Sequence, residues 1–291
     1  MIWQTARFVL DLTMPCVMGI VNVTPDSFSD GGQNATSASA LRHCEKLLAD
    51  GAHVLDIGGE SSRPGALPLD LDEELARVIP VVRGAVTMGV PVSVDTYKPQ
   101  VMQAVLDLGA DIINDIWALR QPGAAHVVSQ HAQCGVCLMH MHGDPQTMQV
   151  EPMRGDVVPR VLAFLTESAS SLRALGVTAT RITVDPGIGF GKTVEQNFSL
   201  LARQNELLVA GYPVMVGWSR KSSLAAATSR SLSSVASLDN QARLVPSVAA
   251  ALLAVERGAR IVRVHDVRET VQALAVLRSL GSPVSTKTHQ G

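Results

Sequence analysis

The chain alternates between short apolar runs and longer segments of helical period, and this alternation restricts the possible folds more than any other feature. Each run is rich in valine and isoleucine, has the length of a buried strand, and ends in polar or glycine residues. Strands that alternate with helices in this way form βαβ units around a parallel sheet. The predicted strands are Val17 to Val21, Val54 to Ile57, Val92 to Val94, Ile112 to Asn114, Val136 to Met139, Ile182 to Val184, Val214 to Val216 and Ile261 to Val264.

The segments between these runs predict helices, several of which end at a glycine such as Gly51 or Gly176. The predicted helices are Ser37 to Asp50, Asp70 to Gly84, Pro99 to Leu108, Val157 to Leu175, Glu195 to Gln204 and Ser247 to Arg257. Before the first strand, Ile2 to Leu10 alternates and is followed by a turn at Asp11 to Thr13, which predicts an N-terminal hairpin at the bottom of the fold. We expect one domain over residues 1–291, with a flexible tail from about residue 282.

The parallel sheet is expected to close into a single (β/α)8 TIM barrel, although an open doubly wound sheet is the competing α/β architecture. Polar residues favour closure because they fall at or just beyond the carboxyl ends of the predicted strands, which meet at one mouth in a barrel. An unpaired buried carboxylate is costly, so this recurrence indicates a site and not a role in stability. The residues are Asn22, Asp56, Asp95, Asn114, Asp115, His140, Asp185, Ser219 and His265.

Charge and hydropathy narrow the choice of partners. Lys+Arg 24 against Asp+Glu 26 leaves a formal net charge of -2, with no basic run that could follow a nucleic-acid backbone. No uninterrupted apolar run approaches the roughly 18 residues of a membrane span, and Met1 to Arg7 does not have the pattern of a secretory signal. We therefore expect a cytoplasmic protein that binds neither nucleic acid nor membrane.

The four cysteines are scattered and are expected to remain reduced. Cys134 and Cys137 form a lone CxxC near His131, His140 and His142, which raises the alternatives of a zinc or a redox site. Zinc needs two further ligands at suitable spacing, whereas Cys137 lies in a run that predicts a buried strand. The spacing therefore favours structural cysteines.

The glycine-rich segment Asp185 to Thr193 fits neither common nucleotide-binding pattern. Pro186 stands where the Walker pattern requires glycine, and Gly187, Gly189 and Gly191 are spaced GxGxG and not GxGxxG. The segment is therefore interpreted as a tight loop that presents Asp185 and Phe190, with a purely structural turn as the alternative.

Five segments of the chain resemble the dihydropteroate synthase family, in the order in which the family has them. They are Asn22 to Gly32, Gly58 to Gly65, Asp185 to Lys192, Ser219 to Ser222 and Arg263 to Asp266, so that the resemblance covers almost the entire chain. It implies a (β/α)8 barrel and a transferase of folate biosynthesis. The implied reaction condenses 6-hydroxymethyl-7,8-dihydropterin diphosphate with p-aminobenzoate and releases diphosphate, without a protein nucleophile.

The resemblance also assigns residues to ligands, with Arg63, Lys221 and His265 as the catalytic group. In physical terms, the Asp185 carboxylate can accept the two parallel N–H donors of a pterin edge, and Met139 and Phe190 suit its flat ring. The implied pterin site is Asp95, Asn114, Met139, Asp185, Phe190, Lys221 and Arg263. The diphosphate site is Asn22, Arg63, Arg263 and His265, with Asn22 as a ligand of Mg²⁺, and the p-aminobenzoate site is Phe28, Ser62, Pro64, Ser219 and Ser222.

Structural alternatives exist for several of these residues. Asp95 or Asn114 could cap or turn the chain, Ser222 could be an N-cap, and an isolated arginine is usually a surface residue. Alternative functions are a pterin-binding methyltransferase barrel, which needs no diphosphate clamp, and a catalytically silent paralogue that binds pterin.

The chain also departs from the family pattern. Ser62 replaces the threonine that is usual in the family, and Trp218 replaces a small aliphatic residue. Val245 to Ser247 replaces a Gly-Thr or Gly-Ser pair that leads into the final predicted helix. The third change affects helix packing and any homodimer built on it, and Pro246 is acceptable only in the first turn of that helix.

Overall fold

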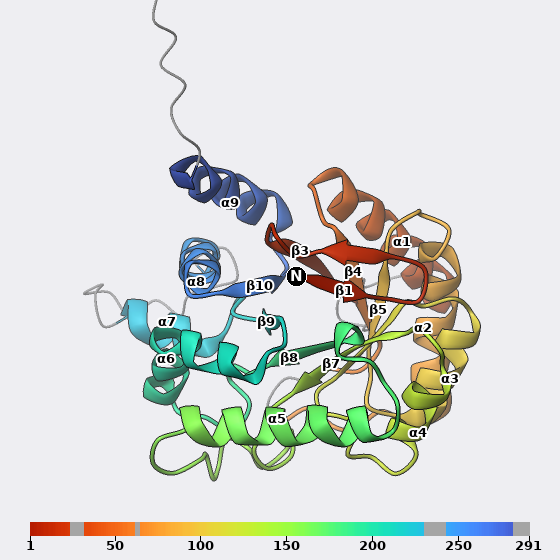
Figure 1. The fold of residues 1–291 in the computed structure, drawn as a ribbon. Coiled ribbons are helices and arrows are strands. Elements are labelled where there is room, and N and C mark those ends of the chain that lie inside the picture. Colours follow the sequence, from red (N-terminus) through yellow and green to blue (C-terminus); the bar gives the residue numbers. More distant parts are fainter. Residues whose placement is uncertain (24–31, 62–64, 230–242, 282–291) are drawn as a thin grey trace, which may run out of the picture.

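The computed structural model describes residues 1–23, 32–61, 65–229 and 243–281. Within them, parallel strands close into a barrel in the order β10-β3-β4-β5-β6-β7-β8-β9 (Figure 1). The barrel strands are β3 (Cys16–Asn22), β4 (Val54–Gly58), β5 (Val92–Asp95), β6 (Ile112–Asp115), β7 (Gly135–Met139), β8 (Ile182–Asp185), β9 (Val214–Val216) and β10 (Ala259–Val264). The predicted TIM barrel and all its predicted strands are confirmed. The open sheet is wrong, because β10 pairs with both β9 and β3 and so completes the ring.

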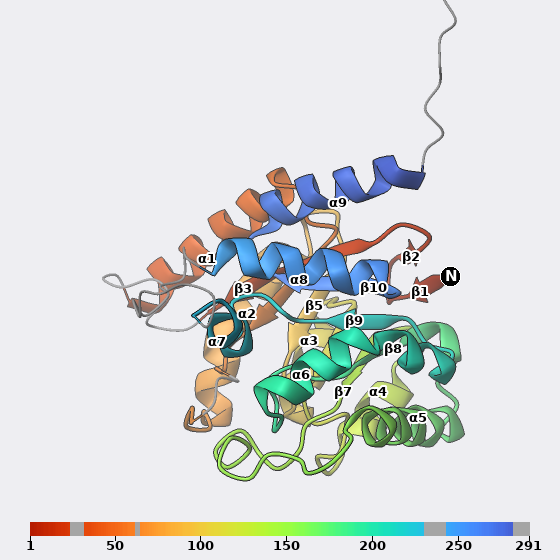
Figure 2. The same cartoon turned by 90° about the vertical axis from the view of Figure 1, so that its left-hand side faces the viewer.

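Helices surround the ring of strands on the outside (Figures 1 and 2). They are α1 (Gly32–Ala49), α2 (Leu71–Ala85), α3 (Pro99–Asp107), α4 (Ala124–Gln130), α5 (Val158–Ala174), α6 (Val194–Ala202), α7 (Ser222–Ser229), α8 (Leu244–Glu256) and α9 (Val267–Gly281), with short 3-10 helices at Ala179–Arg181 and Gln204–Ala210. The predicted helices are confirmed, with ends that differ by a few residues. No helix among the described residues is long and apolar enough to cross a membrane.

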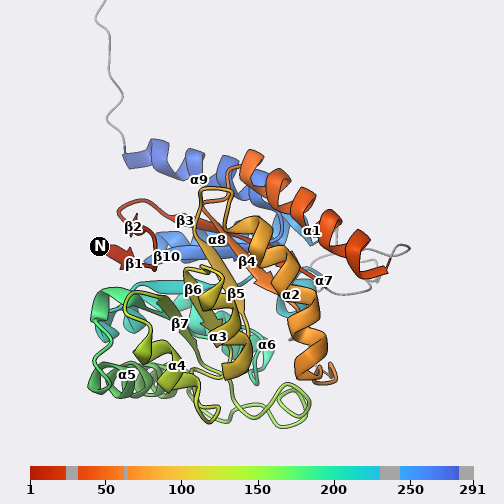
Figure 3. The same ribbon diagram turned by 90° about the vertical axis from the view of Figure 1, so that its right-hand side faces the viewer.

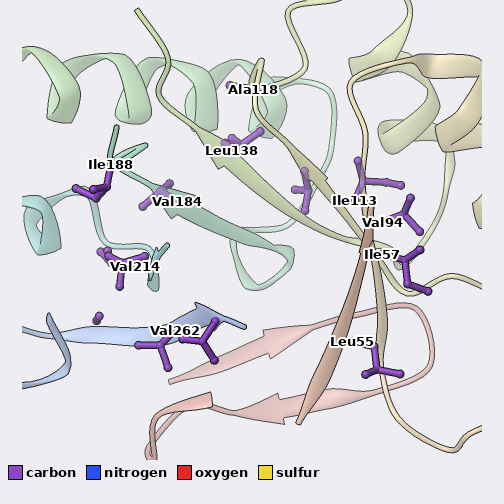
Figure 4. Close-up of a cluster of buried hydrophobic side chains, with 14 of the residues drawn as sticks. Leu55, Ile57, Val94, Ile113, Ala118, Leu138, Val184, Ile188, Val214 and Val262 are labelled. Carbon is purple, nitrogen blue, oxygen red and sulfur yellow. The ribbon is translucent and has the colours of Figure 1, made fainter. Parts of the chain in front are cut away.

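Alternation along each strand divides its side chains between two environments. One set points outward and joins the helices in the largest buried cluster, which includes Leu55, Ile57 and Val94 (Figure 4). The other set points into the barrel, where most residues of the lower part are apolar and the mouth is polar. Because most strands are buried on both faces, their sequences are continuous apolar runs.

The predicted N-terminal hairpin is confirmed, and it closes the bottom of the barrel. β1 (Ile2–Gln4) and β2 (Val9–Asp11) pair antiparallel at the end of the barrel opposite α7 (Figure 3). Trp3 is fully buried in a cluster with inward-facing residues of several strands, among them Met18 and Ile112. Its indole Nε1 donates a hydrogen bond of 3.0 Å to the carbonyl oxygen of Arg181.

The cysteines take no exposed position: all are free and buried. Cys137 belongs to the apolar cluster around Trp3, as expected for a strand residue that faces the barrel interior. Cys134 lies next to Arg181, whose Nη2 is 3.3 Å from the sulfur atom.

The unusual segment Val245 to Ser247 fits its helix. Because α8 begins at Leu244, Pro246 stands in the first turn, where a backbone N–H takes no part in the helix. Ser247 Oγ donates to the carbonyl of Arg243 at 2.6 Å and accepts from the Arg220 N–H at 2.9 Å. Ser247, one of the residues that depart from the family pattern, therefore connects α8 to the loop that precedes α7.

Replacing Trp3 by alanine should destabilise the barrel strongly, because it opens a cavity in the bottom cluster and removes the bond to Arg181. We expect Trp3→Ala to lower the free energy of unfolding by about 3 to 5 kcal/mol, measured by urea denaturation followed by circular dichroism. Val9→Ala is the matched control on the same hairpin, since Val9 is 57% exposed. A loss as small for Trp3→Ala as for the control would show that the hairpin does not stabilise the barrel.

Candidate active site at the barrel mouth

Arg263 lies inside the barrel and connects three strands. From β10, its Nε donates to Asp56 Oδ2 of β4 at 2.6 Å, and its Nη2 donates to Asp95 Oδ2 of β5 at 2.7 Å. Asn114 of β6 donates through Nδ2 to the same Asp56 oxygen at 3.2 Å. The four side chains form a continuous polar network across the mouth, which we call the mouth network.

Burial and charge act against each other in this network. Burial raises the pKa of Asp95 to about 7, and the positive charge of Arg263 opposes that rise. For Arg263, burial disfavours the charge, but the carboxylates of Asp56 and Asp95 outweigh it, so that its pKa is raised. Asp56 is 0% exposed, and its buried Oδ1 has no hydrogen-bond partner among the residues that the structure describes.

Asp185 ends β8 on the other side of the mouth and shapes the glycine-rich loop that follows. Its Oδ1 accepts the Gly187 N–H at 2.7 Å, which fixes the side chain against its own loop. Burial raises the pKa of Asp185, while the bond from Gly187 and the charges of Lys221 and Arg263 lower it. These donors favour an ionised carboxylate at the position predicted for pterin recognition.

An apolar surface lies next to these carboxylates. Met139 and Phe190, both predicted to contact a flat ring, belong to one buried cluster with Ile116, Met141 and Met148. Lys221 Nζ lies 4.3 Å from the centre of the Phe190 ring, and burial lowers the pKa of this lysine to about 8, an effect that Asp185 opposes. The cluster can bind a planar ring by its face while the polar groups bind its edge.

The loop between β9 and α7 brings Ser219 and His265 together. Ser219 Oγ lies 2.9 Å from His265 Nδ1 and accepts the His265 backbone N–H at 3.2 Å. Arg220 adopts a left-handed conformation with φ 60°, and its guanidinium forms an ion pair of 2.7 Å with Asp266. This turn places Lys221 immediately before α7, which begins at Ser222.

The structure therefore places most of the predicted site at one end of the barrel. Asp95, Asn114 and Arg263 are in direct contact through the mouth network; Asp185, Lys221, Met139 and Phe190 border it; Ser219 and His265 form a pair. Asn22 ends β3, and Ser222 begins α7. Phe28, Ser62, Arg63 and Pro64 lie outside the described residues.

The geometry answers one alternative interpretation and locates one departure from the family pattern. Asp95 binds Arg263, and Asn114 binds Asp56, so neither side chain caps a helix. Trp218 is 1% exposed and packs against Phe198 of α6, with ring centres 5.5 Å apart, so the substitution faces the helices and not the mouth.

Sequence reasoning gave no role to some residues of the mouth. Asp56 was noted only as a strand-end carboxylate, and its pairing with Arg263 depends on barrel closure. Trp117 and Tyr97, whose ring centres are 6.3 Å apart, border a cavity of about 200 Å³ beside Asp95. The sequence signal for Trp117 is its position two residues after Asp115, just beyond the end of a predicted strand.

The described residues contain no group of three or more His, Cys, Asp or Glu side chains that could hold an ion. Asn22 provides one amide oxygen at the end of β3. This donor suits Mg²⁺ that takes its other ligands from phosphate and water.

Comparison with known proteins agrees with this geometry. The family model described as pterin binding enzyme matches residues 18–265, which defines the class as pterin-binding enzymes. Dihydropteroate synthase of Neisseria meningitidis serogroup C is 47% identical, with 96% of this chain and 98% of the relative covered. The chain belongs to the dihydropteroate synthase family.

Solved structures of the family match over nearly the whole chain. The Xanthomonas albilineans dihydropteroate synthase with 4-aminobenzoic acid is 47% identical, with a TM-score of 0.86 and coverage of 94% of this chain and 96% of that one. The Burkholderia cenocepacia enzyme complexed with 7,8-dihydropteroate is 49% identical, with a TM-score of 0.85 and coverage of 96% of both chains.

Replacing Asp185 by asparagine should weaken pterin binding, because the amide keeps one acceptor and loses the charge. Loss of a charged hydrogen bond costs about 1.5 to 3 kcal/mol, or roughly 10-fold or more in Kd. Calorimetric titration with the dihydropterin diphosphate measures the change, and Asp107→Asn on α3 is the exposed control. An unchanged Kd in a folded Asp185→Asn variant would refute the anchoring role.

The pH dependence of pterin binding should report on Lys221. With a pKa of about 8, its ammonium is present at pH 7 and is lost as the pH rises through 8. We expect the affinity for the dihydropterin diphosphate to fall over pH 7 to 9 in the unmodified protein, and Lys221→Met to remove this part of the fall. Because the ligand titrates identically in both experiments, the difference between the two curves isolates the lysine. Parallel curves would contradict the prediction.

Proposed function

We propose that the chain condenses 6-hydroxymethyl-7,8-dihydropterin diphosphate with p-aminobenzoate, yielding 7,8-dihydropteroate and diphosphate in folate biosynthesis. The observation that carries the proposal is the mouth network of Asp56, Asp95, Asn114 and Arg263, opposite Asp185. The similarity to synthases with bound 4-aminobenzoic acid and 7,8-dihydropteroate supports the same substrates.

In this proposal, the pterin ring enters the mouth edge first. Asp185 accepts the paired N–H donors of the aminopyrimidine, and Asp95 and Asn114 bind the opposite edge. Met139 and Phe190 pack on the ring, and Lys221 donates to a ring acceptor. The contact of Lys221 with the Phe190 ring supports this arrangement, since both already lie on one side of the pocket.

The diphosphate is assigned to residues at the outer mouth. Arg263 and His265 are two residues apart on β10 and its extension, hence on the same side of the strand. Asn22 ends the neighbouring strand β3, which pairs with β10. Arg63 completes the group by resemblance. Cationic donors at this place stabilise the charge that develops on the leaving diphosphate.

The reaction needs no protein nucleophile. The bond from the exocyclic methylene carbon to the diphosphate oxygen breaks, and the oxygen keeps the electron pair. The amine nitrogen of p-aminobenzoate then forms the new bond to this carbon and loses a proton. The chain contributes orientation, water exclusion and electrostatic stabilisation, with Arg63, Lys221 and His265 as the catalytic group.

Mg²⁺ is the proposed cofactor, with Asn22 as its protein ligand. When bound, the ion neutralises charge on the diphosphate and so improves it as a leaving group.

The p-aminobenzoate is assigned to the side of the mouth where α7 begins. Its carboxylate would bind Ser222 and the first free N–H groups of α7, and Ser219 would lie close to the amine end. Ser219 is already oriented by its contact with His265. Phe28, Ser62 and Pro64 are assigned by resemblance.

We also propose a cytoplasmic homodimer. The free, buried cysteines suit a reducing compartment. Val245 and Leu253 of α8 and Val276 and Leu280 of α9 are exposed apolar residues that a second copy could cover.

Diphosphate release tests the proposed function. Incubation of the protein with the dihydropterin diphosphate, p-aminobenzoate and Mg²⁺ should release diphosphate and form 7,8-dihydropteroate in equal amounts, and chelation by EDTA should stop both. The control omits p-aminobenzoate. Pterin binding without turnover would indicate a silent paralogue, and methyl transfer without diphosphate release would indicate a methyltransferase.

A further inference from the structure

The glycine-rich loop ends in a lysine that no step of the proposed reaction uses. Lys192 is only 2% exposed. Its Nζ donates to the carbonyl oxygens of Gly187 at 2.8 Å and Phe190 at 3.0 Å, with a longer contact of 3.4 Å to that of His140. The Lys192 Nζ is therefore held by backbone carbonyl oxygens and is shielded from solvent.

These carbonyls belong to the two loops that carry the pterin-facing residues. Gly187 and Phe190 follow Asp185 at the end of β8, and His140 follows Met139 at the end of β7. The loops touch through their backbones, since a Cβ on Gly187 would lie 1.9 Å from the His140 oxygen. Only glycine permits this approach, and it brings partially negative carbonyl oxygens close together.

An ammonium at this point offsets the repulsion between the carbonyls, but it is costly to bury. Burial lowers the pKa of Lys192 to about 7, although the charge of Asp185 opposes this, and Lys221 nearby adds to the lowering. A side chain needed only for packing would avoid this cost if it were apolar. A buried lysine whose Nζ bonds to three backbone carbonyls of these loops therefore indicates a requirement for their geometry.

We propose that Lys192 is a positioning residue for pterin recognition, which ties the loops after β7 and β8 so that Asp185 and Phe190 face the ring. This inference rests on the function proposed above. It concerns a residue that does not touch the substrate and acts through the loops that do. Lys192 also adds positive charge near Asp185, which favours the ionised carboxylate. It is distinct from Lys221, whose ammonium lies over the Phe190 ring.

The main test replaces Lys192 by methionine, which has similar length and no charge. We expect Lys192→Met to stay folded, while the Kd and KM for the dihydropterin diphosphate rise about 10-fold or more. The KM for p-aminobenzoate at saturating pterin should change less than about 3-fold, because Lys192 bonds to the carbonyls of Gly187, Phe190 and His140, and neither Ser219 nor Ser222 contacts that ammonium among the described residues. Lys46→Met is the matched control, since the Lys46 side chain is 64% exposed on α1.

A second variant decides the question if Lys192→Met does not fold. Gly187→Ala keeps the ammonium and drives the same two loops apart, because the added Cβ would collide with the His140 oxygen. It should also weaken pterin binding more than p-aminobenzoate binding. Unchanged pterin affinity in a folded variant, or equal losses for both substrates, would overturn the proposal.

The unmodified protein separates this inference from the proposed function. If it releases diphosphate and Lys192→Met retains its pterin affinity, only the role of Lys192 fails. If the unmodified protein releases none, the proposed function itself fails.

Discussion

The partly buried pairing of Arg263 with Asp56 and Asp95 is the interaction on which the mouth of the barrel depends. An arginine that points into a barrel must be compensated, and here two carboxylates from different strands share that task. This compensation is possible only if β10, β4 and β5 surround one space, so closure of the ring and ionisation of the network support each other. Loss of one partner would leave a charge in the interior without compensation, which is why the three side chains act as a unit.

The barrel interior is divided along its axis, and the division separates stability from binding. At the bottom, Trp3 and the inward apolar residues exclude water and need no polar partner except the Arg181 carbonyl. At the mouth, inward positions of the same strands carry Asp56, Asn114 and Asp185. Two positions below Asp56 and Asn114, Val54 and Ile112 already belong to the apolar cluster. The hairpin therefore allows the mouth to be polar, because it supplies apolar burial at the other end.

The sequence allowed prediction of elements that local pattern determines. Strands buried on both faces appear as apolar runs, and carboxylates at their ends mark the mouth, so the barrel and Asp95, Asn114 and Asp185 could be anticipated. The pairing of Arg263 with Asp56 could not, because it joins residues that lie 207 positions apart and depends on register around a closed ring. The sequence could not predict that Trp218 faces the helices, because a residue just after a strand can face either side of the barrel wall. The roles of individual site residues remain predictions that rest on the resemblance.

Burial assigns different tasks to the three cations around the pterin-facing residues. Arg263 keeps its charge because carboxylates compensate it, so it can serve as a fixed positive group. Lys221 lies over the Phe190 ring and forms no ion pair with a described residue. Burial lowers its pKa, although Asp185 opposes this, so its charge is sensitive to pH and to a bound ligand. Lys192 bonds only to backbone carbonyls among the described residues, so its charge serves the shape of the pocket. The position of a cation relative to backbone, ring or carboxylate therefore determines whether it binds substrate or maintains the surface that does so.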